Sequence, residues 1–96
     1  MRDDHFEWAD DNARTNIRDH GVLFEQATLV FDDMHAIDEI EDSMSYGEER
    51  WSVTGLVDRQ VLVVIYTLRE HRTRIISARR ADRHEREEYY NSRGQA

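Results

Sequence analysis

Seven arginines lie between residues 69 and 86 of a chain whose net charge is −8. Two of them, Arg79 and Arg80, end a short apolar run and precede a charged segment. A guanidinium group stays charged and binds phosphate or carboxylate through a planar fork of donors. It is a poor general base, because it does not deprotonate in proteins. The cluster therefore predicts binding and charge stabilisation at an anionic centre.

Histidines are the candidate proton carriers near neutral pH. His84 lies close in sequence to Arg79 and Arg80 and is a candidate acid or base. His20 lies at the end of the first predicted helix, where packing or bonding to carbonyls competes with a catalytic role. No two histidines have metal-ligand spacing and cysteine is absent, so we expect no metal site and no cofactor.

The charge is divided unevenly along the chain. Residues 1–48 hold 14 acids and three arginines, net −11, whereas residues 49–96 hold seven acids and ten arginines, net +3. Lysine is absent. A coding bias or a salt-adapted surface accounts for the missing lysines but not for the clustered arginines. The positive half fits RNA, and the acidic half fits a basic partner.

The length and hydropathy bound the architecture. A chain of 96 residues predicts one domain with one core. The longest apolar run, residues 61–66, is far shorter than the roughly 20 residues of a membrane helix. We expect a cytoplasmic protein without a membrane partner.

Local patterns predict three helices and three or four strands. The first helix begins at an Asp10 or Asp11 cap and ends at Gly21, with Ala13, Ile17 and His20 on one face. A polar loop is expected over residues 42–49. Further elements are expected at 24–31 (helix), 35–41, 50–57, 61–67 and 73–80 (strands), and after an Asp82–Glu85 capping box (helix).

This order of elements predicts an α+β fold. The two N-terminal helices and the C-terminal helix pack on one face of a small antiparallel three- to four-stranded sheet. The other face can stay open, because part of the strand at residues 50–57 is polar on that side.

Alternation along the last strand separates its two terminal arginines, because adjacent side chains point to opposite faces. Only one of Arg79 and Arg80 can therefore reach the open face, and we expect Arg79 to be the working residue. The arginines expected to share the face of Arg80 are Arg72 and Arg74, and the residues expected to share the face of Arg79 are Thr73 and Ser77.

Several stretches carry a family resemblance. FEWADDNARTNIRDHGVLFEQATLVFDD, YGEERW, VVIYTLRE and TRIISARRADRHEREEYY resemble, in this order, the BrnT-type toxins of type II toxin–antitoxin systems, from Phe6 to Tyr90. The ISARRA segment with its Glu- and Tyr-containing tail is the most specific match. The resemblance implies a single RelE-like ribonuclease domain over residues 1–96 that cleaves RNA and halts translation.

The resemblance also implies partners. The expected antitoxin is BrnA-like, a ribbon-helix-helix protein whose dimer carries two toxins as a heterotetramer and alone contacts operator DNA. The expected substrate is RNA, with ribosome-associated mRNA as one form of it.

Metal-free RNA cleavage requires an activated 2′-hydroxyl, a stabilised phosphate charge and a protonated leaving oxygen, and fixed cations usually supply the largest effect. The resemblance and these requirements together select the site residues. The predicted catalytic residues are Arg79, Arg50, Arg69 and His84, and the predicted RNA-binding residues are Arg80, Arg74, Arg83 and His20.

The competing interpretations of these residues are structural. One of Arg79 and Arg80 pairs with Glu85 or another acid and holds the last helix to the sheet. Arg50 pairs with one of the two acids before it, and Arg69 is solvated. Three tyrosines are candidates for stacking on a base, although the first lies in the most apolar strand and is expected in the core. They are Tyr66, Tyr89 and Tyr90.

The chain departs from the family pattern in its first helix. Ala9 stands where Asp is common, and Asn12 and Asp19 stand where Lys is common. The turn at residues 58–60 also lacks a common glycine. If the lysines bind RNA, this chain is a weakened ribonuclease that acts mainly as an antitoxin-binding partner or co-repressor. If they only decorate the helix, activity is retained.

Overall fold

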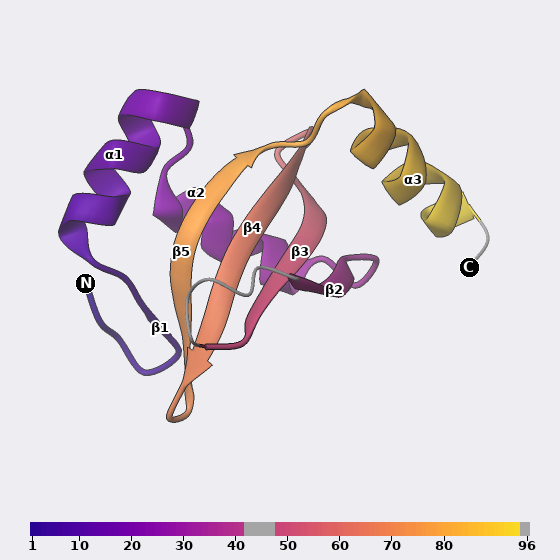
Figure 1. Cartoon of the computed structure of the whole chain (residues 1–96). Coiled ribbons are helices and arrows are strands. Elements are labelled where there is room, and N and C mark those ends of the chain that lie inside the picture. The colour runs from indigo at the N-terminus through magenta and orange to yellow at the C-terminus, as the bar shows by residue number, and fades with distance from the viewer. Residues whose placement is uncertain (42–47, 95–96) are drawn as a thin grey trace.

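A five-stranded sheet in the order β1-β5-β4-β3-β2 is the frame of the molecule (Figure 1). The computed structural model describes residues 1–41 and 48–94. In this part of the chain no helix is long and apolar enough to cross a membrane. The elements in chain order are β1 (Phe6–Glu7), α1 (Asp10–His20), α2 (Phe24–Thr28), the 3₁₀ helix η1 (Leu29–Asp32), β2 (Ile37–Glu41), β3 (Arg50–Val57), β4 (Gln60–Arg69), β5 (Arg72–Arg80) and α3 (Arg83–Gly94).

The sheet is mixed, which corrects the expected antiparallel sheet of three or four strands. Strands β2 to β5 form an antiparallel meander. The additional strand, β1, pairs parallel to β5 with Phe6 opposite Thr73. A strand of two residues is too short to show the period-two pattern by which strands are recognised. Most of the expected polar loop, residues 42–47, lies outside the described residues.

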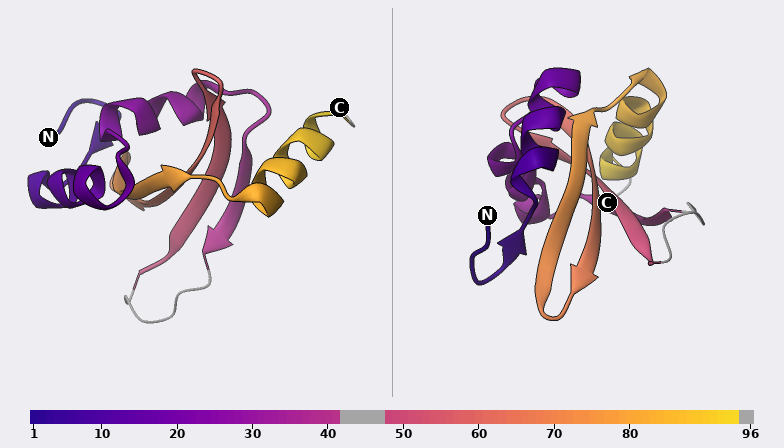
Figure 2. Two further views of the ribbon diagram at one scale, coloured as in Figure 1. Left: turned by 90° about the horizontal axis from the view of Figure 1, so that it is seen from above. Right: turned by 60° about the vertical axis from the view of Figure 1, so that its left-hand side comes forward.

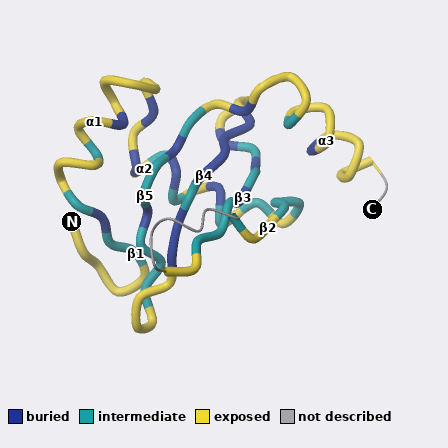
Figure 3. The backbone as a smooth tube through the Cα atoms, viewed as in Figure 1, coloured by how far each residue is buried: buried dark blue, intermediate teal, exposed yellow. Residues whose placement is uncertain are grey.

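The helices cover both faces of the sheet, whereas one covered face was expected (Figure 2). Helices α1 and α2 lie over one face with the larger core, and α3 lies against the other. Strand β4 is buried on both sides over residues 61–64, so apolar cover is needed on each face (Figure 3). On the α3 side this cover is Tyr89, which is 1% exposed and packs with Val61 and Val63.

The larger core contains an aromatic cluster beside α2 and η1. The Trp8 and Phe24 rings meet edge to face at 5.5 Å between centroids, and Phe31 meets Tyr66 in the same way at 5.1 Å. Tyr66 is buried, as predicted, and its hydroxyl donates to Asp38 Oδ1 at 2.6 Å. Burial and this hydrogen bond both raise the pKa of Tyr66 above its ordinary value.

Two glycines meet backbone requirements that position the helices. Gly21 ends α1 with φ 68°, and its amide donates to the Ile17 carbonyl at 2.9 Å, as a left-handed cap requires. Gly55 allows η1 to approach β3, because a Cβ there would lie 2.8 Å from Val30 Cγ1. The predicted start of α1 is shifted: Ala9 occupies the N-cap position without a side-chain bond, and Asp10 lies inside the first turn.

The buried face of α1 differs from the predicted apolar stripe. Ile17 is 47% exposed and His20 is exposed, whereas Asn16 is buried. Asn16 Nδ2 donates to the carbonyls of Ala78 and Val22 at 2.8 and 2.9 Å, and Asn16 Oδ1 accepts from the Ala78 amide at 3.0 Å. Asn16 therefore pairs with β5 as a neighbouring strand would, beyond the point where β1 ends.

A β-bulge interrupts β5 beside this contact. Tyr66 pairs with Ile75 and Ile65 pairs with Ser77, so Ile76 has no partner on β4. One extra residue reverses the side-chain alternation of a strand after the bulge. Ile75 and Ala78 consequently both face the larger core, although they are three residues apart.

Replacing Asn16 with Ala should lower the free energy of unfolding by about 3 kcal/mol, because the buried amide and carbonyl of Ala78 lose their partner. Urea denaturation at neutral pH measures the change. The matched control is Asn12→Ala, at an exposed position one turn earlier in the same helix, which should change stability by less than about 0.5 kcal/mol. Equal effects of the two substitutions would contradict a specific role for Asn16.

Candidate functional site

The bulge decides which arginines share the sheet face that carries α3. Arg79 pairs with Val63, and Arg74 pairs with Thr67, so both arginines lie on that face. Arg80 lies on the opposite face. The prediction that Arg79 and Arg80 point apart is confirmed, but the expected grouping of Arg80 with Arg74 is wrong. The expectation assumed regular alternation, which the bulge breaks.

Two neighbours show the same reversal. Ser77 shares the face of Arg79, as expected, because both follow the bulge. Thr73 and Arg72 precede it, and each lies on the face opposite to the one expected. The face of Arg79 is also partly covered by α3, whereas an open face was expected.

A cavity of about 220 Å³ lies on this face between the sheet and α3. Its lining combines one guanidinium group with four carboxylates, two hydroxyls and apolar side chains. The lining residues are Ile37, Glu39, Glu41, Ser52, Thr54, Val63, Ile65, Arg79, Glu85 and Glu88. The cavity therefore has one group that can bind phosphate and several groups that can accept a proton.

Arg79 forms a two-pronged ion pair with Glu85. Arg79 Nη1 donates to Glu85 Oε1 at 2.7 Å, and Arg79 Nη2 donates to Glu85 Oε2 at 2.9 Å. Glu85 Oε1 also accepts from the Asp82 amide, while Asp82 Oδ1 accepts from the Glu85 amide, each at 2.9 Å. The predicted capping box of α3 is thus confirmed, and it holds Glu85 against Arg79. This is the pairing that the structural interpretation of Arg79 anticipated.

The ion pair shifts the titration of both partners. The Glu85 hydrogen bond raises the pKa of Arg79. The bond from Arg79 lowers the pKa of Glu85 to about 2, assisted by the Asp82 amide and against the effect of burial. Glu85 therefore stays ionised at neutral pH and is a weak base while Arg79 holds it.

Two other predicted arginines on this face are also paired with acids. Arg74 Nη1 bonds Glu7 Oε2 of β1 at 2.7 Å. Arg50 Nη2 lies 3.8 Å from Glu48 Oε1, and the Arg50 side chain is only 16% exposed. The pairing of Arg50 with a preceding acid was the structural alternative to its catalytic role.

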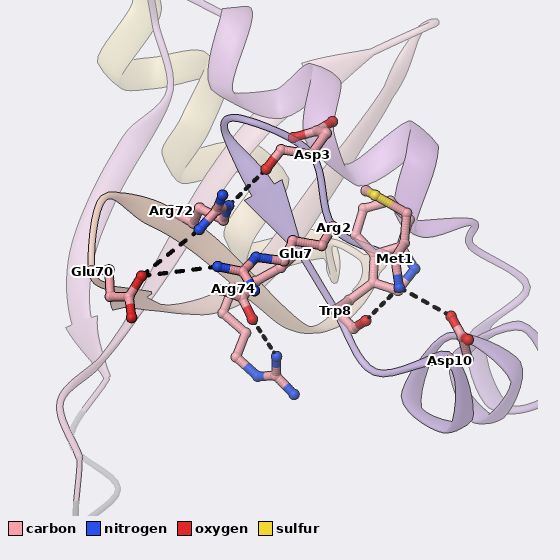
Figure 4. Close-up of polar contacts among 9 residues, drawn as sticks. All are labelled: Met1, Arg2, Asp3, Glu7, Trp8, Asp10, Glu70, Arg72 and Arg74. Carbon is pink, nitrogen blue, oxygen red and sulfur yellow. Dashed lines mark hydrogen bonds and ion pairs between the residues drawn. The ribbon is translucent and has the colours of Figure 1, made fainter.

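The N-terminal segment explains the pairing of Arg74 and its neighbour Arg72 (Figure 4). Arg72 Nε donates to the Asp3 carbonyl at 2.7 Å, and Arg72 Nη1 lies 3.8 Å from Glu70 Oε2. With the bond from Arg74 to Glu7, these contacts fasten the first residues to β5. The two arginines thus hold the edge of the sheet together.

Three further predicted residues lie outside the cavity. Arg69 is exposed at the far end of β4, opposite Arg72. His84 is 86% exposed, and its Nε2 lies 3.8 Å from Oε2 of Glu88, a cavity residue. Arg83 is exposed, and its Nε donates to Glu87 at 3.0 Å.

Arg80 and His20 lie together on the α1 side. Arg80 Nη1 donates to the His20 carbonyl at 3.2 Å, and the His20 side chain is exposed at the helix end. Asn12 and Asp19, which stand where lysines are common, line a separate cavity of about 210 Å³ with His20 and Ile76. The structure thus places Arg50 and Arg74 on the face of Arg79 and His20 beside Arg80. The other three predicted residues, Arg69, His84 and Arg83, are exposed outside the cavity.

Sequence reasoning missed the carboxylates of the cavity. Glu39 and Glu41 alternate along β2 and line the same face, which was a readable signal once the strand was assigned. Glu85 was recognised as a cap and as a partner of arginine but not as a site residue. Within residues 1–41 and 48–94, no three His, Asp or Glu side chains are arranged to hold a metal ion.

A comparison with protein families gives a match that covers most of the chain. The model described as the ribonuclease toxin BrnT of a type II toxin–antitoxin system matches residues 8–85. The matched segment runs from Trp8 through the sheet to Glu85 in the first turn of α3. A comparison with curated proteins gave no match.

Replacing Glu85 with Gln should lower the free energy of unfolding at pH 7 by about 1–2 kcal/mol, allowing for the partial exposure of the pair. The folded-state pKa of Glu85 lies below its ordinary value of 4.5, at about 2. The stabilisation is therefore complete above about pH 4.5 and is lost as the pH falls towards 2. Urea titrations of both proteins across this range should converge at low pH. A constant difference would contradict the linkage.

Proposed function

We propose that this chain, which belongs to the family of BrnT ribonuclease toxins of type II toxin–antitoxin systems, cleaves RNA in the cavity around Arg79 without a metal ion and thereby inhibits translation. The observation that supports this location is the two-pronged Arg79–Glu85 pair at the lining of the cavity. A carboxylate on this guanidinium fork occupies the position that two oxygens of a phosphodiester would take.

RNA binding begins, in this proposal, with an exchange of anions on Arg79. The Arg79 side chain is 41% exposed, so an incoming phosphate can reach the guanidinium group. The phosphate replaces the Glu85 carboxylate and receives two charge-assisted hydrogen bonds in its place. Arg79 then stabilises the charge that develops on the phosphate during attack.

The displaced Glu85 becomes the proton acceptor. Away from Arg79 it loses the contact that depresses its pKa, and its basicity returns towards the ordinary carboxylate range. It accepts the proton of the ribose 2′-hydroxyl while the 2′-oxygen bonds to phosphorus and the bond to the 5′-oxygen breaks. The products are a 2′,3′-cyclic phosphate and a 5′-hydroxyl. The proton of this hydroxyl comes from protonated His84, which lies outside the cavity with its Nε2 3.8 Å from the cavity residue Glu88.

The remaining predicted residues contact RNA outside the cavity under the same proposal. Arg50 and Arg74 lie on the face of Arg79 and contact flanking nucleotides, as does Arg69 at the far end of β4. The remaining three RNA-binding residues of the proposal lie at the end of β5 and on two helices. These residues are Arg80, Arg83 and His20.

The proposed protein partner is a BrnA-like ribbon-helix-helix antitoxin. Two toxins ride on an antitoxin dimer, and operator DNA is contacted by the antitoxin alone. The net charge of −8 supports a basic protein partner over direct contact between this chain and DNA.

Arg79→Ala should reduce RNA cleavage by about 100-fold or more, and Arg79→Lys should restore only part of the loss, because an ammonium group lacks the two-pronged geometry. Cleavage of a defined RNA is measured with purified protein in excess EDTA. Arg14→Ala, at an exposed position on α1, is the control and should retain full cleavage. Loss of cleavage in EDTA by the wild-type protein would refute the metal-free mechanism.

The acidic lining favours a second candidate function. Four carboxylates surround the single guanidinium group of the cavity and oppose the approach of RNA. Under this alternative the chain is a weakened toxin that acts mainly as the antitoxin-binding partner or co-repressor. The exposed positions of Asn12 and Asp19 fit this interpretation, since lysines there would add two cations and remove an acid.

Restoring both lysines distinguishes the candidates. If the chain is a weakened ribonuclease, Asn12→Lys with Asp19→Lys should raise RNA cleavage by about ten-fold and steepen its decline with salt. If the wild-type chain cleaves RNA and the two lysines leave the cleavage rate unchanged, the second candidate is contradicted. Growth after expression of each protein alone, without an antitoxin, provides the cellular measurement.

A further inference from the structure

The arginines of this chain fall into two classes. Most form an ion pair with an acid. On a protein of net charge −8, guanidinium groups without such a pair are the sites where an anion gains most. Within the described residues, the arginines with no carboxylate oxygen within 4.0 Å are Arg59, Arg69, Arg80, Arg86 and Arg93.

Three of these arginines line one cavity. Arg59, Arg80 and Arg86 surround a space of about 170 Å³ together with Tyr90, and we call these four residues the arginine–tyrosine pocket. Its residues come from the turn between β3 and β4, the end of β5 and α3. Figure 1 shows these segments close together at one end of the sheet. It shares no lining residue with the cavity around Arg79.

Backbone carbonyls orient two of the three guanidinium groups. Arg80 Nη1 donates to the His20 carbonyl at 3.2 Å, and Arg86 Nη1 donates to the Ala81 carbonyl at 2.8 Å. A carbonyl partner fixes the direction of a guanidinium group without neutralising its charge. Each guanidinium group has further donors that a ligand can use.

Arg59 is presented by a tight turn. Asp58 and Arg59 have φ angles of 48° and 70°, and they connect β3 to β4 as the two central residues of a hairpin. Side chains other than glycine, asparagine and aspartate are disfavoured in this conformation. The chain therefore keeps an arginine at a position where glycine would be less strained, which points to a use for the guanidinium group.

Tyr90 supplies an exposed aromatic surface beside these cations. Tyr90 is 46% exposed, and the buried Tyr89 ring supports its ring edge to face at 5.2 Å between centroids. Tyr89 in turn is anchored through its hydroxyl to Asp33 Oδ2. Arg86, Tyr90 and Arg93 follow at i, i+4 and i+7, so they lie along one side of α3.

We propose that the arginine–tyrosine pocket binds single-stranded RNA, with a backbone phosphate among its arginines and a base stacked on Tyr90. Three cations, two of them oriented by backbone carbonyls, lie beside one supported aromatic ring and match the two chemical features of a single strand, its phosphates and its bases. A protein ligand with acidic side chains would use the cations but would not require the exposed ring.

The pocket positions RNA for the cavity around Arg79. Arg79 and Arg80 are consecutive residues on opposite faces of β5, so a single strand that crosses the end of β5 meets both. The inference rests on the proposed function only in taking RNA as the ligand. Binding at this pocket and cleavage at Arg79 are separate properties and are measured separately.

Binding is tested with a short fluorescein-labelled single-stranded RNA whose 2′-hydroxyls are methylated, so that it cannot be cleaved. In fluorescence anisotropy at about 0.1 M salt, Arg86→Glu should raise the Kd about ten-fold and reduce the salt slope by about one or more. Arg18→Glu makes the same charge change on exposed α1 and should change the Kd less than about two-fold. Arg59→Glu, in the exposed turn, repeats the test without altering α3.

The tyrosine is tested with a matched pair. Tyr90→Ala should raise the Kd about five- to ten-fold, whereas Tyr90→Phe should bind as the wild type does, because stacking requires the ring and not the hydroxyl. Equal effects of Arg86→Glu, Arg59→Glu and Arg18→Glu would overturn the pocket as a site. Loss of antitoxin binding with unchanged RNA binding would also overturn it and assign the surface to a protein partner.

Cleavage of unmodified RNA by the same proteins separates the two proposals. Wild-type protein that binds the methylated RNA through Tyr90 and Arg86 but cleaves no RNA would refute the ribonuclease proposal and support the pocket. Wild-type protein that cleaves RNA while the pocket variants bind normally would refute the pocket alone.

Discussion

The β-bulge at Ile76 is the constraint on which the arrangement of charge depends, and beside it lies the pairing of the buried Asn16 side chain with the backbone of Ala78. This pairing covers the edge of β5 where β1 has ended, and it lies close to the unpaired Ile76. Without the extra residue, every side chain from Ser77 to Arg80 would change faces. The bulge therefore places Arg79 beside α3 and Arg80 beside the end of α1.

The molecule separates two uses of arginine. On the face that carries α3, carboxylates engage the guanidinium groups, and these pairs connect separate segments: Arg79 to α3 and Arg74 to β1. Backbone carbonyls engage Arg80 at the end of β5 and Arg86 in α3, and they leave the charge of both arginines uncompensated. The first kind of contact stabilises the fold, and an anion must displace an acid to use it. The second kind keeps cations available on an acidic protein.

Local features of the fold were predictable because their causes lie within a few residues. The Gly21 cap of α1, the Asp82–Glu85 capping box, and the alternation and apolar content of β3 and β4 each follow from neighbours in the sequence. Features that depend on distant partners were missed. The short β1 forms only because β5 offers it an edge, and α3 crosses to the second face because β4 is apolar on both sides.

The family resemblance, the α+β class, the concentration of arginine near the last strand and the rule that Arg79 and Arg80 point apart can all be read from the order of residues. The three-dimensional fold settles which face each of the two arginines occupies, since one unpaired residue reverses the alternation and leaves no local signature. It also decided that Glu85 reaches Arg79, while Arg59, Arg86 and Tyr90 meet around one pocket with Arg80. Charge can be counted along a chain, but its compensation depends on which distant side chains the fold brings together.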